Sequence, residues 1–320
     1  MPLREIGSTG IQVTPVAMGC WPIAGVTSIH VTEENSLATL QAAADAGITH
    51  FDTAWIYGYE GESEKLIGRA LGHRRDEITI ASKGGIHWEN REQAHDARPE
   101  TIRAECEGSL KRLGTDRIDL YYLHSPDPAV PLAETAGAFR ELLDEGKIRS
   151  VGVSNCRVPQ LEEFSRVCPL SASQPPYNML QRHIEEEHLP WCREHNVSLM
   201  IYWPLMKGLL AGKLARDHQF EPQDGRQKLP MFQGEEWEKT QDLLDVLREV
   251  AAEAEVTIAQ LVIHWTISQP GITAALCGAK RPEQIVETAA AMNISLTESQ
   301  QTRIDQAVAE RGSTILTRPV

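Results

Sequence analysis

Residues 50–58, HFDTAWIYG, are the stretch from which the fold of this 320-residue chain can be worked out. The stretch begins with a short apolar run that ends at Phe51 and Asp52, and it then turns into a loop that carries Tyr57. In α/β folds, chemistry gathers at the carboxyl ends of strands, where these polar residues would lie. An Asp at a strand end is more often a turn cap than a catalyst. Which of the two roles Asp52 has therefore depends on the residues at the other strand ends.

The same unit, a short apolar strand followed by a helix, recurs along the whole chain. The expected strands span residues 16–19, 48–54, 78–85, 118–124, 148–155, 171–178, 197–205 and 272–279. Their apolar residues run on without alternating, which predicts strands buried on both faces. Eight such units predict an α/β protein with the (β/α)8 TIM-barrel fold, formed as one domain over residues 1–320. No strand is followed by G-x-G-x-x-G, which argues against a Rossmann domain.

Three segments stand outside this repeat. Ser8, Thr9 and Gly10 lie between short alternating runs and predict an N-terminal β-hairpin that caps the barrel. Residues 86–97 read as a polar loop. Residues 207–233 are irregular and rich in Gly, Pro, Gln and Asp, and loops of that length are usually functional lids or disordered. Extra helices are expected near the C-terminus, the last of them after a capping box formed by Thr297 and Gln300.

Composition excludes several classes of protein. A formal net charge of −14 argues against a nucleic-acid partner, which would need clustered Lys and Arg. No apolar run approaches the roughly 18 residues that span a bilayer, and the N-terminus has no secretory apolar region, so we expect a cytoplasmic protein without a membrane partner. The six cysteines and eleven histidines show no metal-ligand spacing. We therefore expect buried, reduced thiols and no metal.

The polar residues at the predicted strand ends form a coherent set. In chain order they are Asp52, Tyr57, Lys83, His124, Ser154, Asn155, Gln174, Tyr202 and Trp203. The first four could act together as a proton donor. A lysine ammonium close to a tyrosine phenol lowers the phenol pKa from about 10, a carboxylate orients that lysine, and a histidine binds an oxygen. Each residue alone has an ordinary structural explanation, but four such coincidences on adjacent strand ends are improbable.

The chain resembles the aldo-keto reductases along essentially its whole length. The resemblance rests on six segments in the same order: AGITHFDTAWIYGYEGESEKLIG (46–68), IASKGG (80–85), SLKRLGTDRIDLYYLH (109–124), GKIRSVGVSN (146–155), SQPPYN (173–178) and YWPLMKGLLAGKL (202–214). It implies hydride transfer between a nicotinamide cofactor and a carbonyl carbon. The family's catalytic tetrad falls on Asp52, Tyr57, Lys83 and His124, with Tyr57 as the general acid.

The resemblance also implies how a cofactor binds. Ser154, Asn155 and Gln174 match the residues that hold the nicotinamide carboxamide, and Tyr202 matches the aromatic that stacks on the ring. Trp203 stands where the family usually has a small residue, which leaves open which aromatic stacks. The residues matched to the pyrophosphate loop and the adenosine end are Leu205, Gly208, Lys213, Gly278, Lys280, Arg281, Gln284 and Glu287. Lys280 and Arg281 precede a helix that opens at Pro282, which favours NADPH over NADH, although NADH remains possible.

The remaining expectations concern the substrate. Trp21, Trp55 and Trp88 lie at or just past strand ends and are expected to line an apolar pocket for a small carbonyl compound. Three alternatives stay open: an enzyme that mainly oxidises alcohols, a slowly reacting NADPH-sensing subunit, and an aldolase with Lys83 as the Schiff-base lysine. The last would need a neutral amine, which Asp52 disfavours. The sequence gives neither the substrate nor the oligomeric state.

Overall fold

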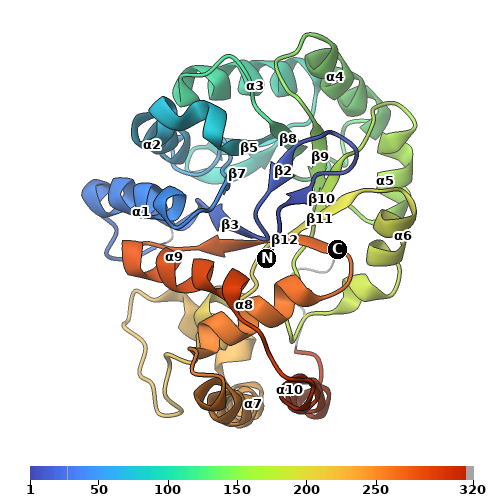
Figure 1. Cartoon of the computed structure of the whole chain (residues 1–320). Coiled ribbons are helices and arrows are strands. Elements are labelled where there is room, and N and C mark those ends of the chain that lie inside the picture. Colours follow the sequence, from blue (N-terminus) through green and yellow to red (C-terminus); the bar gives the residue numbers. More distant parts are fainter. Residues whose placement is uncertain (27, 315–320) are drawn as a thin grey trace.

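The structure, a computed structural model, describes residues 1–26 and 28–314, and a closed barrel of parallel strands forms its centre (Figure 1). The strands, in barrel order, are β3 (Val16–Gly19), β4 (His50–Asp52), β5 (Thr79–Gly84), β8 (Leu120–Leu123), β9 (Val151–Ser154), β10 (Ala172–Gln174), β11 (Ser198–Ile201) and β12 (Ile272–Gly278). Because β12 pairs in parallel with β3, the first and last strands close the barrel. The predicted (β/α)8 architecture is confirmed.

Helices surround the barrel on its outer side (Figure 1). Those between strands are α1 (Glu33–Asp45), α2 (Glu62–Leu71), α3 (Pro99–Leu113), α4 (Leu132–Asp144), α5 (Val158–Ser165), α6 (His188–Glu194) and α8 (Ile258–Ser268), and α9 (Pro282–Ala289) follows the last strand. The extra helices α7 (Gly234–Glu253) and α10 (Glu298–Arg311) pack on each other. Thr297 and Gln300 form the expected capping box at the start of α10.

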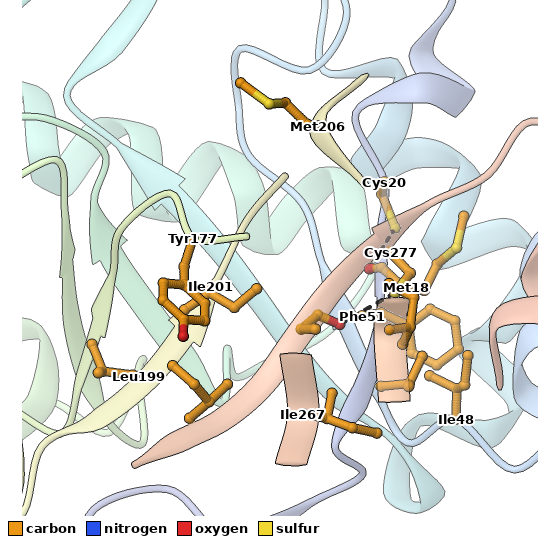
Figure 2. Close-up of a cluster of buried hydrophobic side chains, with 14 of the residues drawn as sticks. Met18, Cys20, Ile48, Phe51, Tyr177, Leu199, Ile201, Met206, Ile267 and Cys277 are labelled. Atoms are coloured by element: carbon orange, nitrogen blue, oxygen red, sulfur yellow. Dashed lines mark hydrogen bonds between the residues drawn. The ribbon is translucent and has the colours of Figure 1, made fainter. Parts of the chain in front are cut away.

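The main hydrophobic core lies between the strands and the helices. Figure 2 shows part of it, a cluster that includes Phe51 of β4, Leu199 of β11, Ile267 of α8 and Cys277 of β12. A second cluster fills the barrel interior, and it includes Ile6 and other residues of the hairpin formed by β1 (Arg4–Glu5) and β2 (Gln12–Val13). The predicted hairpin thus closes the end of the barrel away from the carboxyl ends of its strands.

The structure departs from the sequence expectations in two loops. The predicted polar loop at 86–97 contains an antiparallel hairpin, β6 (Ile86–Glu89) and β7 (Glu92–His95), whose turn holds Asn90 and Arg91 at positive φ. The irregular stretch 207–233 holds three short 3₁₀ helices: η4 (Met206–Ala211), η5 (Gly225–Lys228) and η6 (Pro230–Phe232). All six cysteines are free and buried, as expected.

Within the described ranges, 1–26 and 28–314, no helix has the length and apolar character needed to cross a membrane. Nor does any group of three His, Cys, Asp or Glu side chains there have a geometry that could hold a metal ion. The last residues, 316–320, for which folding over the site or fraying was considered, lie outside the described part of the chain.

Candidate active site

The alternation of side chains along each strand decides which polar residues face the barrel interior. Ala81 of β5 belongs to the interior cluster, so Lys83, two residues further on, points the same way, while Ser82 points outward. Tyr122 of β8 is also interior, and His124 follows it by two residues at the end of the strand. The predicted catalytic residues therefore form the uppermost layer of the barrel interior, at the carboxyl ends of the strands.

Lys83 is the centre of this layer and is completely buried. Its Nζ donates hydrogen bonds to Asp52 Oδ1 at 2.5 Å, to the Thr53 carbonyl at 2.8 Å and to Tyr57 Oη at 3.1 Å. The Tyr57 and His124 rings meet edge to face, with their centroids 5.9 Å apart. The structure thus brings together all four residues of the predicted tetrad, although they come from three different strand ends.

The charges in this cluster are mutually dependent. Burial alone would lower the pKa of Lys83, but attraction to Asp52 and Tyr57 outweighs it and raises the pKa, so the amine stays charged. Burial raises the pKa of the Tyr57 phenol, while the charge and the hydrogen bond of Lys83 act in the opposite direction. The expected net lowering of this pKa is therefore wrong for the protein alone, because desolvation exceeds the effect of Lys83.

A second chain of hydrogen bonds runs from the tetrad across the neighbouring strand ends. Gln174 Nε2 donates to the second carboxylate oxygen of Asp52 at 2.7 Å, and Ser154 Oγ donates to the Gln174 carbonyl at 2.8 Å. Asn155 Nδ2 donates to Ser154 Oγ at 3.1 Å, and Tyr202 Oη donates to Asn155 Oδ1 at 2.9 Å. The residues matched to nicotinamide binding therefore form one network, in which Asn155 adopts a left-handed φ of 57°.

Trp203 lies in a different environment from Tyr202. It also has a positive φ, 60°, and its ring meets that of Tyr202 nearly at right angles. The ammonium of Lys207 lies 4.5 Å from the centroid of the Trp203 ring. Tyr202 is therefore part of the hydrogen-bonded network at the strand ends. The Trp203 ring instead contacts Lys207, at the start of the 207–233 segment.

The loop between β12 and α9 collects most of the residues matched to the adenosine end. The backbone N–H of Lys280 donates to Gln284 Oε1 at 2.8 Å, and Lys280 Nζ donates to the Ile29 carbonyl at 3.1 Å. Lys213 is paired with Glu287 at 2.5 Å, which ties the 207–233 segment to α9. Arg281 is the N-cap residue of α9, and its side chain makes no capping hydrogen bond. It therefore does not occupy the backbone N–H groups of the first helical turn.

The 207–233 segment adds a cation that the sequence did not single out. Asp224 holds the Arg226 guanidinium through both Nε and Nη2, and Nη1 donates to the Lys207 carbonyl at 3.3 Å. Burial lowers the pKa of Lys280; repulsion by Arg226 and Arg281 adds to this effect, and attraction to Asp224 and Glu221 acts against it. The composition of the segment did not point to Arg226, because the direction of its side chain depends on how the segment folds.

The three other residues matched to cofactor binding, Leu205, Gly208 and Gly278, affect the backbone of the loops around this site. Gly208 has a φ of 90°, which favours glycine, and its N–H donates to the Leu205 carbonyl at 2.9 Å. A Cβ at Gly278 would lie 2.9 Å from Pro22 Cγ, so a side chain there would push on the loop after β3.

Two of the three predicted pocket tryptophans lie beside Tyr57. The Trp21 ring meets the Tyr57 ring edge to face at 4.9 Å. Trp88, on the β6–β7 hairpin, donates through Nε1 to the carbonyls of Ile56 and Gly58, at 3.0 and 2.9 Å. This hairpin therefore fixes the backbone on both sides of Tyr57.

Trp55 lies elsewhere. The Arg112 guanidinium covers its ring, 3.9 Å from the centroid, and the ring lines a cavity of about 390 Å³ together with residues of α3. Strand-end position alone suggested that Trp55 faces the substrate. Instead, the ring packs against α3, where Arg112 is its cation–π partner, and Trp55 is therefore not part of the pocket beside Tyr57.

The fold and the site together define a barrel enzyme with a buried lysine–carboxylate pair beside a tyrosine at its strand ends. A family model described as the Aldo/keto reductase family matches residues 15–309, and the chain belongs to this family of oxidoreductases, whose members use nicotinamide cofactors.

Relatives of known name support this assignment over most of their length. The chain is 38% identical to aldo-keto reductase YhdN of Bacillus subtilis, covering 89% of this chain and 87% of that one. It is 34% identical to the NADH-specific methylglyoxal reductase of Escherichia coli, covering 93% and 95%. Its structure resembles that of the glycerol dehydrogenase AKR11B4 from Gluconobacter oxydans, with a TM-score of 0.90, 33% identity and coverage of 99% and 98%.

Proposed function

We propose that this protein reduces a small aldehyde or ketone to the alcohol with NADPH, and that Tyr57 is the general acid. The observation that carries the proposal is the contact of Lys83 Nζ with both Asp52 and Tyr57, at 2.5 and 3.1 Å, inside the barrel mouth. A buried ammonium that touches a phenol has little structural purpose, because burying a charge is costly. It has an evident purpose if the phenol must give up its proton.

The residues at the strand ends fit a nicotinamide ring. Ser154, Asn155 and Gln174 offer amide and hydroxyl groups in one hydrogen-bonded row beside Asp52. These donors and acceptors are suited to a carboxamide. Tyr202 is fixed to this row through Asn155, so we assign the stacking role to Tyr202 rather than Trp203. When bound, a reduced nicotinamide supplies the hydride that adds to the carbonyl carbon.

The protein's own groups would handle the proton. Lys83 donates its hydrogen bond to Tyr57 Oη, so the phenol hydrogen can be directed at the oxygen of a bound carbonyl. As that oxygen gains negative charge, Tyr57 transfers the proton, and the nearby ammonium stabilises the phenolate left behind. Asp52 holds the ammonium in place, and His124, next to Tyr57, orients the carbonyl oxygen by a hydrogen bond. Trp21 and Trp88 provide the apolar wall.

The preference for NADPH rests on the cations near α9. Lys280 and Arg281 precede the helix start, and Arg226 reaches the same region from the 207–233 segment. A 2′-phosphate there would meet the helix N-terminus, Lys280, and the guanidinium groups of Arg226 and Arg281, which in the protein alone are paired with Asp224 and Glu283. Lys213 and Glu287 would hold the segment over the pyrophosphate, with Leu205 and Gly208 at its start, while Gly278 and Gln284 shape the loop.

Relatives bear on the substrate class and on the direction of reaction. One acts on methylglyoxal by its name and another is named a glycerol dehydrogenase, so a substrate of about three carbons is our first choice. The second name also supports an alternative in which the protein mainly oxidises an alcohol, with the Tyr57 phenolate as the base. Because Lys83 is kept charged by Asp52, the Schiff-base reaction is not proposed.

The first experiment is a titration of the purified protein with NADPH and NADH, followed by quenching of tryptophan fluorescence. Tighter binding of NADPH supports the phosphate site, and equal or tighter binding of NADH contradicts it. Turnover is then measured with methylglyoxal and with glycerol. Binding without any turnover would contradict the reductase and favour a cofactor-sensing role, and failure to bind either cofactor would contradict the proposal as a whole.

A further inference from the structure

A buried carboxyl group lies behind the strand that carries Lys83. Glu105 of α3 is 9% exposed, and its Oε2 accepts a hydrogen bond from the backbone N–H of Gly85 at 2.6 Å. Gly85 directly follows β5 and has a φ of 93°. A Cβ on Gly84 would lie 3.0 Å from the same carboxyl oxygen. The strand end and Glu105 are therefore packed together without spare room.

The peptide group held by Glu105 has a second partner on the active-site side. Its N–H belongs to Gly85, and its C=O belongs to Gly84, which accepts the backbone N–H of His124 at 2.9 Å. The residue before this peptide is Lys83, whose carbonyl accepts the N–H of Trp55 at 3.3 Å. One peptide plane thus connects Glu105, outside the barrel, with the backbone of two residues of the tetrad. Hydrogen bonds in series through one peptide strengthen each other.

We propose that Glu105 is a positioning residue for the reductase reaction, and that its carboxylate sets the orientation of the Gly84–Gly85 peptide and thereby the alignment of Lys83 and His124. This inference rests on the proposed function for its kinetic part. It assigns no contact with substrate or cofactor to Glu105.

The surroundings of Glu105 make its charge adjustable near neutral pH. The charged and titratable groups that face it are His87 of β6, Asp96 before α3, Arg112 of α3, Glu64 of α2 and Tyr121 of β8. Burial raises the pKa of Glu105 to about 8; Gly85 and Arg112 act against this rise, and Asp96 and Glu64 add to it. Arg112 compensates little, because Glu64, with which it pairs at 2.6 Å, holds it.

Protons can reach this carboxyl group from outside. The cavity of about 390 Å³ beside α3 has Glu105 in its wall. The other lining residues are Trp55, Glu100, Thr101, Ala104 and Arg112. His87 Nδ1, 3.3 Å from Glu105 Oε1, belongs to a side chain that is partly exposed. The group can therefore equilibrate with the pH of the solution.

The charge of Glu105 should change the strength of its hold on the peptide. A carboxylate accepts a hydrogen bond from an N–H about twice as strongly as a neutral acceptor does. The Glu105→Gln variant keeps an acceptor of the same shape but stays neutral at every pH. Its rate should therefore match that of the wild type in mild acid, where Glu105 is protonated, and fall behind in base.

The first test is an amide NMR titration of the wild-type protein between about pH 6 and pH 9.5. The Gly85 and His124 amide signals should shift together with a midpoint near 8, and E105Q should abolish both shifts. The matched control is Glu100→Gln, an exposed carboxyl on the same helix, which should leave both shifts in place. A Gly85 or His124 amide that does not titrate would contradict the proposal.

The second test measures single-turnover rates of the NADPH-loaded enzyme with methylglyoxal across the same pH range. The ratio of the E105Q rate to the wild-type rate should be near one in mild acid and fall to about a third to a tenth in base, with unchanged NADPH affinity. A ratio that does not vary with pH would contradict the proposal. If the wild type shows no turnover, the proposed function fails, and the NMR titration alone decides whether Glu105 is coupled to His124.

Discussion

The strand ends around Lys83 and the segment 207–233 both border the proposed cofactor, but they are built in opposite ways. The first region holds its charges fully buried: Lys83 is 0% exposed and its partner Asp52 is 2% exposed. The second holds charges at the surface, as in the pair of Lys213, 57% exposed, with Glu287. Buried groups in a packed barrel have one arrangement, whereas an ion pair whose lysine is exposed can open at little cost. We therefore expect a rigid catalytic layer next to a segment that can open and close.

The largest expected effect is the loss of the general acid. Tyr57→Phe should lower the rate constant of reduction by about 10²–10⁴-fold, because the phenol proton is gone while the packing of the ring against Trp21 and His124 remains. Cofactor affinity, measured by fluorescence titration, should be unchanged. Tyr59→Phe is the matched control, since Tyr59 is exposed two residues away and should react normally. A Y57F enzyme with nearly full activity would exclude Tyr57 as the acid.

The next effect concerns stability and tests the rigidity of the first region. Asp52→Asn leaves the Lys83 ammonium buried without its carboxylate, which should cost about 3–5 kcal/mol of the free energy of unfolding in a urea titration. Glu33→Gln, which breaks the exposed pair with Arg69, should change this free energy little. Similar values for the two variants would show that burial of an ion pair does not decide how much its loss costs the protein.

The pH dependence of stability tests the same region at His50, a buried residue that lies two positions before Asp52 on β4. Burial lowers the pKa of this imidazole to about 4, so the folded protein binds its proton later than the unfolded chain does, and stability is lost as the pH falls from about 6.5 towards 4. His50→Leu should reduce the loss measured between pH 6.5 and pH 5 by about 1.6 kcal/mol. A loss of stability that His50→Leu leaves unchanged would contradict the lowered pKa of this imidazole.

The smallest effect belongs to the second region. Arg226→Gln should weaken NADPH binding by about tenfold and leave NADH binding unchanged, because one charge-assisted contact to the 2′-phosphate is lost. Arg216→Gln is the control on the same segment, since Glu238, Asp242 and Asp245 of α7 hold that arginine. Equal weakening of NADPH and NADH would place Arg226 near a phosphate that both cofactors share.

The two regions also differ in how far their structure could be predicted from sequence. Strand ends at Asp52, Lys83 and His124 followed from apolar runs with polar residues after them, because a buried parallel strand leaves that pattern. The barrel then brings them together without further information. Segment 207–233 has no such periodicity, so neither its 3₁₀ turns nor the direction of Arg226 could be derived.

Two other features show where local patterns mislead. The β6–β7 hairpin was missed because its turn, Asn90–Arg91, lacks the glycine that usually marks such turns. Trp21 and Trp55 both closely follow the ends of their strands, yet the Trp21 ring meets Tyr57, whereas Arg112 of α3 covers the Trp55 ring. Contacts between distant elements decide such cases, and one sequence does not reveal them.

The most direct test of the central claim is isotope transfer. The protein is incubated with methylglyoxal and NADPH deuterated at C4 of the nicotinamide, and the alcohol product is analysed by mass spectrometry. The account predicts deuterium on the carbinol carbon with the wild type and almost none in the same time with Tyr57→Phe. Product without deuterium, or equal labelling by both proteins, would contradict hydride transfer assisted by Tyr57.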